Sequence, residues 1–355
     1  MSGISLILVM GGAGFIGSNF VRRALDAGWS VVSLDALTYA GNLRSLEDVE
    51  DSPNYQFQHG NICDGELVSG LLSRYRPRAV VNFAAESHVD RSIERPGAFI
   101  ETNVLGTQRL LTSSLAYWQG LSAKEQHAFR YLQVSTDEVY GSISMGQASE
   151  ETPYAPNSPY AASKAGGDHL TRAFHVTYGL PTITTCSSNN YGPYQFPEKL
   201  IPLAILKAQL NEPIPIYGDG QQTRDWIHVF DNCDALLGLV DEGQPGRTYN
   251  IGGSNERTNV ELVKEICRLL ERLAPSPHGR PFEALISFVS DRPGHDRRYA
   301  LSSERIQREL GWRPKIEFAK GLSETIAWYL ENSVWVDDIR QHRYGGERLG
   351  LGAAR

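Results

Sequence analysis

The chain is poor in cysteine and methionine and has no long apolar run. Among its 355 residues are three methionines and four cysteines, Cys63, Cys186, Cys233 and Cys267. The cysteines are scattered and form no Cys-x-x-Cys pair, which argues against a zinc cluster and favours reduced thiols in a cytoplasmic protein. Because no apolar run reaches about 18 residues, we expect neither a signal peptide nor a membrane span.

The chain also lacks a basic block. Its 34 lysines and arginines stand against 41 aspartates and glutamates, for a net charge of −7. A nucleic acid or an anionic membrane is therefore not an expected partner. The nine histidines show no zinc-type spacing such as His-x-x-x-His, so no metal site is expected. With 41% hydrophobic and 21% charged residues, the composition is that of an ordinary globular protein.

Apolar runs alternate with helix-like segments through the first half of the chain. The expected strands are Ile4 to Met10, Ser30 to Leu34, Tyr55 to His59, Ala79 to Phe83, Phe129 to Val134 and Pro181 to Cys186. Such apolar runs are typical of strands buried in a parallel sheet. The expected helices between them include Ser18 to Ala27 and one long helix from Pro96 to Tyr117. This alternation predicts an α/β fold with a doubly wound, Rossmann-type parallel sheet.

The sequence changes character near residue 190. Beyond it the chain is less regular and richer in proline, polar and aromatic residues, apart from amphipathic helices at Asn259 to Leu273 and Leu322 to Glu331. We expect residues 1–190 to form a nucleotide-binding domain. Residues 191–355 should form mainly a smaller, irregular α/β substrate domain, with some chain returning to the first.

A glycine motif joins the first strand to the first helix. Gly11-x-x-Gly14-x-x-Gly17 lies between them, and Asp35 ends the second strand. Glycines allow the backbone to approach a pyrophosphate, whose charge the free N–H groups of a helix start can bind. An acid at the end of the second strand would bond ribose hydroxyls and repel a 2′-phosphate. The pattern predicts an NAD site, with a simple tight turn as the alternative.

Two adjacent acids follow the fifth strand, in Ser135-Thr136-Asp137-Glu138. They lie at the sheet edge where open α/β sheets bind ligands, although a solvated loop would also accept them. A helix starts at Ser158 and Pro159 and carries Tyr160 and Lys164, four residues apart on one face. A cation beside a phenol lowers the phenol pKa and makes it a usable base. We predict a catalytic pair here, the alternative being two surface side chains.

Loops of the second half contain candidate phosphate ligands. Lys199, Arg224 and Arg292 lie in segments rich in glycine and proline. Arginine binds phosphate oxygens bidentately, so these residues could hold a second, mobile diphosphate. A solvated surface position is the alternative for each.

With these segments read, the chain resembles the bacterial dTDP-glucose 4,6-dehydratases of the extended short-chain dehydrogenase/reductase superfamily. The similarity runs from Gly11 to about Trp335. The most specific segments are Asp35 to Asn42, Ala84 to Ser92, Ser135 to Gly141, Asn189 to Tyr194 and Asp291 to His295. The Tyr/Lys pair indicates the superfamily and Asp137-Glu138 indicates the reaction.

The resemblance implies a role for each catalytic residue. Tyr160, as phenolate, would take the C4 hydroxyl proton of dTDP-glucose while hydride passes to NAD⁺, with Thr136 bonded to the same oxygen. Lys164 would hold the ribose and lower the Tyr160 pKa. Glu138 would then remove the C5 proton, and protonated Asp137 would give a proton to the leaving C6 hydroxyl. Hydride returning to C6 would yield a 4-keto-6-deoxy sugar nucleotide for deoxysugar synthesis, rhamnose included.

The resemblance also implies the binding residues. With the glycines, Tyr160 and Lys164, the NAD site would comprise Phe15, Ile16, Asp35, Ala36, Leu37, Thr38, Asn61, Ile62, Ala84, Ala85, Ser87, Thr102 and Asn190. The sugar-nucleotide site would comprise Ser87, Thr136, Asn189, Lys199, Leu200, Pro215, Ile216, Tyr217, Arg224, Asn259, Arg292 and His295. The chain departs from the family pattern at Met10, usually Thr, at Asn61, usually Asp, and at Cys186.

Other functions remain open at this stage. A UDP-glucose dehydratase is one alternative, because thymine and uracil differ by one methyl, worth only about 1 kcal/mol in an apolar pocket. A sugar-nucleotide epimerase or decarboxylase is a further alternative, as is a non-catalytic NAD-sensing protein. The resemblance also implies a homodimer through the helices at Pro96 to Tyr117 and Pro159 to Tyr178.

Overall fold

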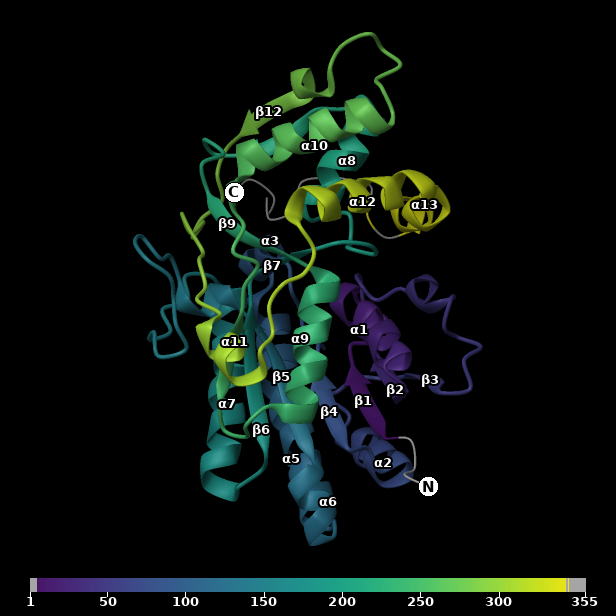
Figure 1. The fold of residues 1–355 in the computed structure, drawn as a ribbon, viewed down its shortest axis with the longest axis vertical. Coiled ribbons are helices and arrows are strands. Elements are labelled where there is room, and N and C mark those ends of the chain that lie inside the picture. The colour runs from purple at the N-terminus through teal and green to yellow at the C-terminus, as the bar shows by residue number, and fades with distance from the viewer. Residues whose placement is uncertain (1–4, 343, 345–355) are drawn as a thin grey trace.

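A seven-stranded parallel sheet forms the centre of the molecule (Figure 1). The fold is that of a computed structural model, which describes residues 5–342 and residue 344. The strand order is β10-β6-β5-β4-β1-β2-β3. The strands are β1 (Leu6–Met10), β2 (Ser30–Asp35), β3 (Tyr55–His59), β4 (Ala79–Asn82), β5 (Arg130–Thr136), β6 (Thr182–Ser187) and β10 (Thr248–Ile251). The order reverses between β1 and β4, as in a doubly wound sheet, so the predicted fold class is confirmed.

The six predicted strands are all present, with bounds that differ by one or two residues. Ile4, the first residue of the expected first strand, lies outside the described residues. The expected fifth strand ended at Val134, whereas β5 continues through Thr136. The sheet also contains β10, which comes from the second half of the chain and pairs with β6.

Helices cover both faces of the sheet. On one face lie α1 (Phe15–Asp26), α9 (Val229–Glu242) and α11 (Glu304–Leu310). On the other lie α2 (Gly65–Tyr75), α5 (Thr107–Gln119) and α7 (Pro159–Tyr178), whereas the short α6 (Ala123–Ala128) follows α5 and has no buried residue. Each face buries an apolar cluster, and the strands between them supply fully buried residues such as Leu8 and Val9. Burial on both sides explains why the strands are continuously apolar.

Three helix predictions were wrong in detail. The expected helix from Leu322 to Glu331 begins earlier, at Phe318. The first helix begins at Phe15 rather than Ser18, because Gly14 is its N-cap. The expected long helix from Pro96 to Tyr117 consists of α4 (Pro96–Phe99), a π-helical segment η2 (Ile100–Gly106) and α5. The π turn packs against α7, where a Cβ on Gly167 would lie 2.8 Å from the Asn103 carbonyl oxygen. Gly166 and Gly167 therefore allow close packing between α7 and the π segment.

A second region lies beyond the carboxyl ends of the strands, at the top of Figure 1. Its helices are α8 (Leu200–Gln209), α10 (Asn259–Leu273), α12 (Phe318–Glu331) and α13 (Ser333–His342). Its strands form two small sheets, β11 (Glu256–Thr258), β9 (Thr223–His228) and β7 (Asn189–Tyr191), and β12 (Ile286–Val289) with β8 (Ile214–Tyr217). The remaining short elements are spread along the whole chain. They are α3 (Val89–Glu94) and the 3₁₀ turns η1 (Leu43–Leu46), η3 (Asp137–Tyr140) and η4 (Phe282–Leu285). The apolar sides of α8, α10 and α12 pack together in a cluster of their own.

Candidate active site

The glycine turn lies at the carboxyl end of β1. Gly11 has φ +81°, and a Cβ there would lie 2.7 Å from the Ala84 nitrogen, so the turn requires glycine. Gly14 caps α1 without a side-chain hydrogen bond. The first amides of this twelve-residue helix therefore point to the sheet edge without a side-chain cap, as an anion-binding helix start requires.

Asp35 ends β2 beside this turn. Its carboxylate accepts hydrogen bonds from the Ala13 amide at 2.9 Å and from the Leu37 amide at 2.8 Å. The acid therefore ties the glycine turn to the loop after β2. Its predicted contact with ribose hydroxyls stays a prediction.

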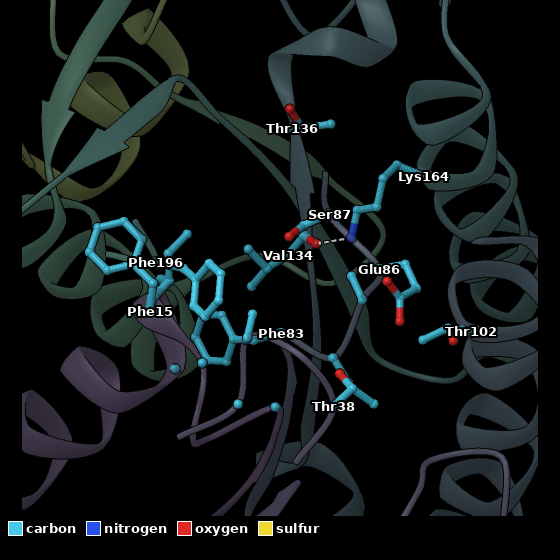
Figure 2. Close-up of a pocket in the computed structure, with 18 of the residues that line it drawn as sticks. Phe15, Thr38, Phe83, Glu86, Ser87, Thr102, Val134, Thr136, Lys164 and Phe196 are labelled. Carbon is cyan, nitrogen blue, oxygen red and sulfur yellow. Dashed lines mark hydrogen bonds between the residues drawn. The ribbon is translucent and has the colours of Figure 1, made fainter. Parts of the chain in front are cut away.

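A cleft of about 310 Å³ opens at this edge of the sheet. It brings together residues from the glycine turn, β2, the loop after β4, β5, α7 and the segment before α8 (Figure 2). The predicted residues that line it are Gly11, Gly14, Phe15, Ile16, Gly17, Asp35, Ala36, Thr38, Asn61, Ile62, Ala84, Ala85, Ser87, Thr102, Thr136, Asp137, Glu138, Tyr160, Lys164, Asn189, Asn190 and Lys199. The other predicted residues lie outside its lining, namely Leu37, Leu200, Pro215, Ile216, Tyr217, Arg224, Asn259, Arg292 and His295.

The cleft also has lining residues that the sequence reading missed. They include Tyr39, Phe83, Glu86, Gln195, Phe196 and Glu198. Tyr39 and Glu86 lie inside two of the segments that carry the resemblance, Asp35 to Asn42 and Ala84 to Ser92. Those segments could therefore have indicated both residues as part of the site. The Arg91 guanidinium lies over the Tyr39 ring at 4.1 Å and 3.4 Å from the buried Glu198 carboxylate.

The Tyr160 and Lys164 side chains come from the first turns of α7. The predicted helix start is confirmed, because the Ser158 hydroxyl accepts the Ala161 amide at 3.1 Å with Pro159 following. Lys164 Nζ donates to the Val134 carbonyl at 2.6 Å, the bond drawn in Figure 2. Burial lowers the Lys164 pKa. Burial and the Glu138 charge raise the Tyr160 pKa well above its usual value, while a hydrogen bond with Thr136 lowers it.

Asp137 and Glu138 form the start of η3, directly after β5. Asp137 is 3% exposed, and burial together with the Glu138 charge raises its pKa well above the usual value. Burial raises the pKa of Glu138 as well, but the charges of Arg292, Arg224 and Lys199 oppose that rise. The surroundings therefore favour a proton on Asp137 and a charge on Glu138.

The cations of the second region lie close to the acids. Arg224 is buried, donates to the carbonyls of Thr223 and Asp296, and lies 4.1 Å over the Tyr299 ring. Arg292 donates to Asp90 at 3.0 Å, and its buried Nε has no hydrogen-bond partner. The charges of both arginines oppose the rise of the Glu138 pKa. The carboxyl end of β5 and the segments that carry Arg224 and Arg292 therefore face one another.

The remaining predicted residues occupy the second region in different ways. Tyr217 donates to Asp90 at 2.8 Å, and His295 Nδ1 lies 2.6 Å from Asp291. Leu200 and Asn259 begin α8 and α10, and Pro215 lies on β8. The Ile216 side chain is buried in the apolar cluster of this region and leaves only its backbone for a ligand.

Comparisons with known proteins agree with this geometry. Residues 8–325 match the family model described as GDP-mannose 4,6 dehydratase. A dTDP-glucose 4,6-dehydratase of Xanthomonas campestris is 56% identical over 97% of this chain and 98% of its own. One from Neisseria meningitidis is 54% identical over 98% and 99%. The Streptomyces venezuelae enzyme, solved with NAD bound, superposes with a TM-score of 0.86 at 45% identity over 94% and 99%. This chain belongs to the dTDP-glucose 4,6-dehydratases.

The three departures from the pattern of the dTDP-glucose 4,6-dehydratases have visible surroundings. Met10 is fully buried in the core at the end of β1. Asn61 accepts the Cys63 amide at 2.9 Å through its side-chain oxygen. Cys186 is buried on β6, with its sulfur 3.6 Å from the Tyr154 hydroxyl. None of the three removes the glycine turn, the Tyr/Lys pair or the two acids.

Proposed function

We propose that the protein converts dTDP-glucose to dTDP-4-keto-6-deoxyglucose with a bound NAD that is regenerated in each turnover. The observation that carries this is the acid pair beside Tyr160, in which burial and the Glu138 charge raise the Asp137 pKa well above its usual value, whereas three cations oppose the rise of the Glu138 pKa. Elimination of water needs one acid and one base at the same time, and this pair supplies both.

The cleft residues fit a dinucleotide. The amides of α1 start without a side-chain cap, and Gly14 lines the cleft beside them. The side-chain oxygens of Asn189 and Asn190 are buried, line the same cleft and have no hydrogen-bond partner. NAD⁺, when bound, would accept a hydride from C4 and return it to C6. The chain's part is to hold the pyrophosphate at α1 and the ribose hydroxyls at Asp35.

Tyr160 would act as the base at the C4 hydroxyl. Its pKa is raised by burial and by Glu138, so it needs help to lose its proton. Thr136 supplies part of that help through its hydrogen bond. Lys164 lies one helical turn away, but its ammonium donates to the Val134 carbonyl. We infer that the Lys164 charge lowers the Tyr160 pKa once substrate and cofactor are bound.

The two acids would act after C4 is oxidised, because a ketone at C4 acidifies the C5 proton. Glu138, whose rise in pKa is opposed by Arg292, Arg224 and Lys199, would remove that proton. Asp137, kept protonated by burial and by Glu138, gives its proton to the departing C6 oxygen. The two titrate as a coupled pair, so each depends on the charge of the other.

The diphosphate of the substrate would lie among the arginines of the second region. The buried Nε of Arg292 is a donor without a partner, as a site built for an anion would have. Lys199 adds a positive charge at the cleft, where its Nζ donates to the Ser87 carbonyl at 3.1 Å. The division into a domain of residues 1–190 and one of residues 191–355, mainly for substrate, stays part of this proposal.

Mass spectrometry of the purified protein with dTDP-glucose, and no added NAD, tests the function. We expect a product lighter by one water, with the alkaline chromophore of a 4-keto sugar. A repeat with UDP-glucose ranks the two nucleotides. A product of unchanged mass would contradict the dehydratase and indicate an epimerase.

We also propose a homodimer through the helices that bear Ile100, Leu105, Val176 and Tyr178. These apolar side chains are 48%, 48%, 66% and 51% exposed and come from η2 and α7, which pack together. Light scattering would give twice the chain mass, and Leu105→Glu with Val176→Glu would reduce it to the monomer.

The described helices include none long and apolar enough to cross a membrane. A cytoplasmic location stays a prediction.

A further inference from the structure

Asp168 is a buried carboxylate that the reaction proposed above does not use. It lies on α7, one helical turn after Lys164, and is 3% exposed. Its Oδ2 accepts the Ser135 hydroxyl at 2.5 Å and the Tyr154 hydroxyl at 3.2 Å. Its Oδ1 is buried and has no hydrogen-bond partner. A carboxylate in such a place is costly unless a cation compensates it.

The end of β5 connects Asp168 to the catalytic groups. Three consecutive residues of β5 each form a hydrogen bond with one of the side chains Lys164, Asp168 and Tyr160. The Val134 carbonyl accepts Lys164 Nζ, the Ser135 hydroxyl donates to Asp168, and Thr136 is hydrogen-bonded to Tyr160. The lysine and the carboxylate therefore lie against the same strand, directly beside the base.

From this geometry we infer that Asp168 is a positioning residue, whose buried charge keeps Lys164 an ammonium ion and so helps Tyr160 to lose its proton. The inference rests on the proposed roles of Lys164 and Tyr160.

The electrostatics of the cluster agree with this role. Burial lowers the Lys164 pKa, and Asp168 is the main group that raises it again. Burial raises the Asp168 pKa to about 7, and Lys164 opposes that rise most strongly. The other titratable groups that face Asp168 are Tyr131 from β5, Tyr140 from η3, Tyr154 from the loop before α7 and Cys186 from β6. Burial raises all four pKa values, which leaves them neutral at pH 7. Asp168 is thus the member of this cluster whose pKa lies near neutrality, and Lys164 is the charge that opposes its rise most strongly.

Replacing Asp168 by its neutral isostere should change the pH dependence of the reaction. Without the carboxylate, Lys164 loses its counter-charge and becomes neutral at lower pH. A neutral lysine no longer favours the phenolate, so the limb along which kcat rises with pH should move up by about one unit, a tenfold loss of kcat on that limb. Because Asp168 does not touch the cleft, KM for dTDP-glucose should stay within about twofold.

The test compares Asp168→Asn with Asp231→Asn over the pH range of activity. Asp231 is a matched control, since it is 3% exposed and accepts the backbone amides of Lys315 and Ile316 on the far side of the sheet. The control should lower stability without moving the pH profile. Asp168→Glu, which keeps the charge, should return the limb toward its original position. If Asp168→Asn has the wild-type profile, or loses activity equally at every pH, the inference is overturned.

Two further measurements keep the test decisive. Should Asp168→Asn fail to fold, Tyr154→Phe removes a hydrogen bond that lowers the Asp168 pKa and should move the limb in the same direction by a smaller amount. Infrared difference spectra of the NAD-loaded protein, without substrate, should show a protonated buried carboxyl disappearing near pH 7. The Asp168 band is identified by its shift in Tyr154→Phe, and an Asp168 carboxyl that stayed protonated throughout the pH range of activity would overturn the inference. This readout needs no turnover, so failure of the proposed reaction would be seen separately, in the wild-type product.

Discussion

The Asp90 carboxylate lies 3.0 Å from the Arg292 guanidinium, although the two residues are 202 positions apart in the chain. Asp90 is on α3, beside the sheet, and Arg292 is in a loop of the second region. The other Asp90 oxygen accepts the Tyr217 hydroxyl at 2.8 Å. One buried carboxylate thus orients two of the residues that we propose to hold the sugar nucleotide.

We expect Asp90→Asn to weaken substrate binding. The amide cannot hold the guanidinium as an ion pair, so Arg292 loses its fixed position for the diphosphate. The KM for dTDP-glucose should rise about tenfold, equivalent to about 1.4 kcal/mol of binding. Initial rates with wild-type and variant protein measure this. Asp219→Asn is the control, because it breaks the exposed pair with Arg297. An unchanged KM in Asp90→Asn would contradict the role given to this contact.

Replacing the base should stop the reaction after its first half. Glu138→Gln removes the charge that raises the Tyr160 pKa, so oxidation at C4 is not impaired. The C5 proton then has no base, and kcat should fall by a factor of about 10² to 10⁴. Reduced nicotinamide should therefore accumulate when dTDP-glucose is added, as its absorbance would show. Tyr160→Phe is the contrasting variant, in which none should form. Full turnover by Glu138→Gln would rule out the assigned role.

Residue type and spacing were sufficient to predict six of the seven strands of the sheet and to select candidate catalytic residues that the structure brings to one cleft. The strands are continuous apolar runs, and Gly11, Asp35, Tyr160 and Lys164 each follow from a local pattern. Asp90 could not be found in this way, since nothing local signals a partner 202 positions away. Asp168 carries no sequence signal either, because an acid on a helix is ordinarily solvent-exposed.

The helix that carries the π turn shows a different limit of sequence reading. The pattern from Pro96 to Tyr117 fits a regular helix, yet residues Ile100–Gly106 form a π segment. The reason is packing against α7 at Gly166 and Gly167, which becomes visible only when both helices are placed. The periodicity of a sequence reports on one helix by itself, whereas this distortion depends on how two helices pack against each other.

These two glycines should differ in their tolerance of alanine. A Cβ on Gly167 would lie 2.8 Å from the Asn103 carbonyl oxygen, a backbone atom that cannot move alone. Gly167→Ala should lower the free energy of unfolding by about 2 kcal/mol. A Cβ on Gly166 would lie 3.2 Å from a Val104 methyl, which can shift. Gly166→Ala should stay within about 1 kcal/mol of wild type, helped by the higher helix propensity of alanine. Urea unfolding at fixed NAD measures both, and equal losses would contradict the packing argument.

His88 should make the protein sensitive to mild acid. Burial and the charges of Lys199, Arg292 and Arg91 lower its pKa from 6.5 to about 2, so the contact with Glu198 at 4.0 Å is not an ion pair near neutrality. In the unfolded chain the same histidine takes up a proton as the pH falls below about 6.5. The unfolded state therefore gains protons that the folded state does not, and the free energy of unfolding falls with pH. Between pH 6.5 and about 5 the loss from this group should be about 2 kcal/mol.

The His88 prediction is tested by the slope of stability against pH. Urea unfolding at fixed NAD, repeated across that interval, should show a smaller loss for His88→Gln than for the wild type. His127→Gln is the control, since His127 is exposed on α6 and should keep the wild-type slope. Absolute stability of His88→Gln at pH 7 does not enter the comparison, because the linkage concerns only the change with pH. If the His88→Gln slope equals the wild-type slope, burial and the cations around residue 88 do not hold the imidazole neutral, and its charge state must be revised.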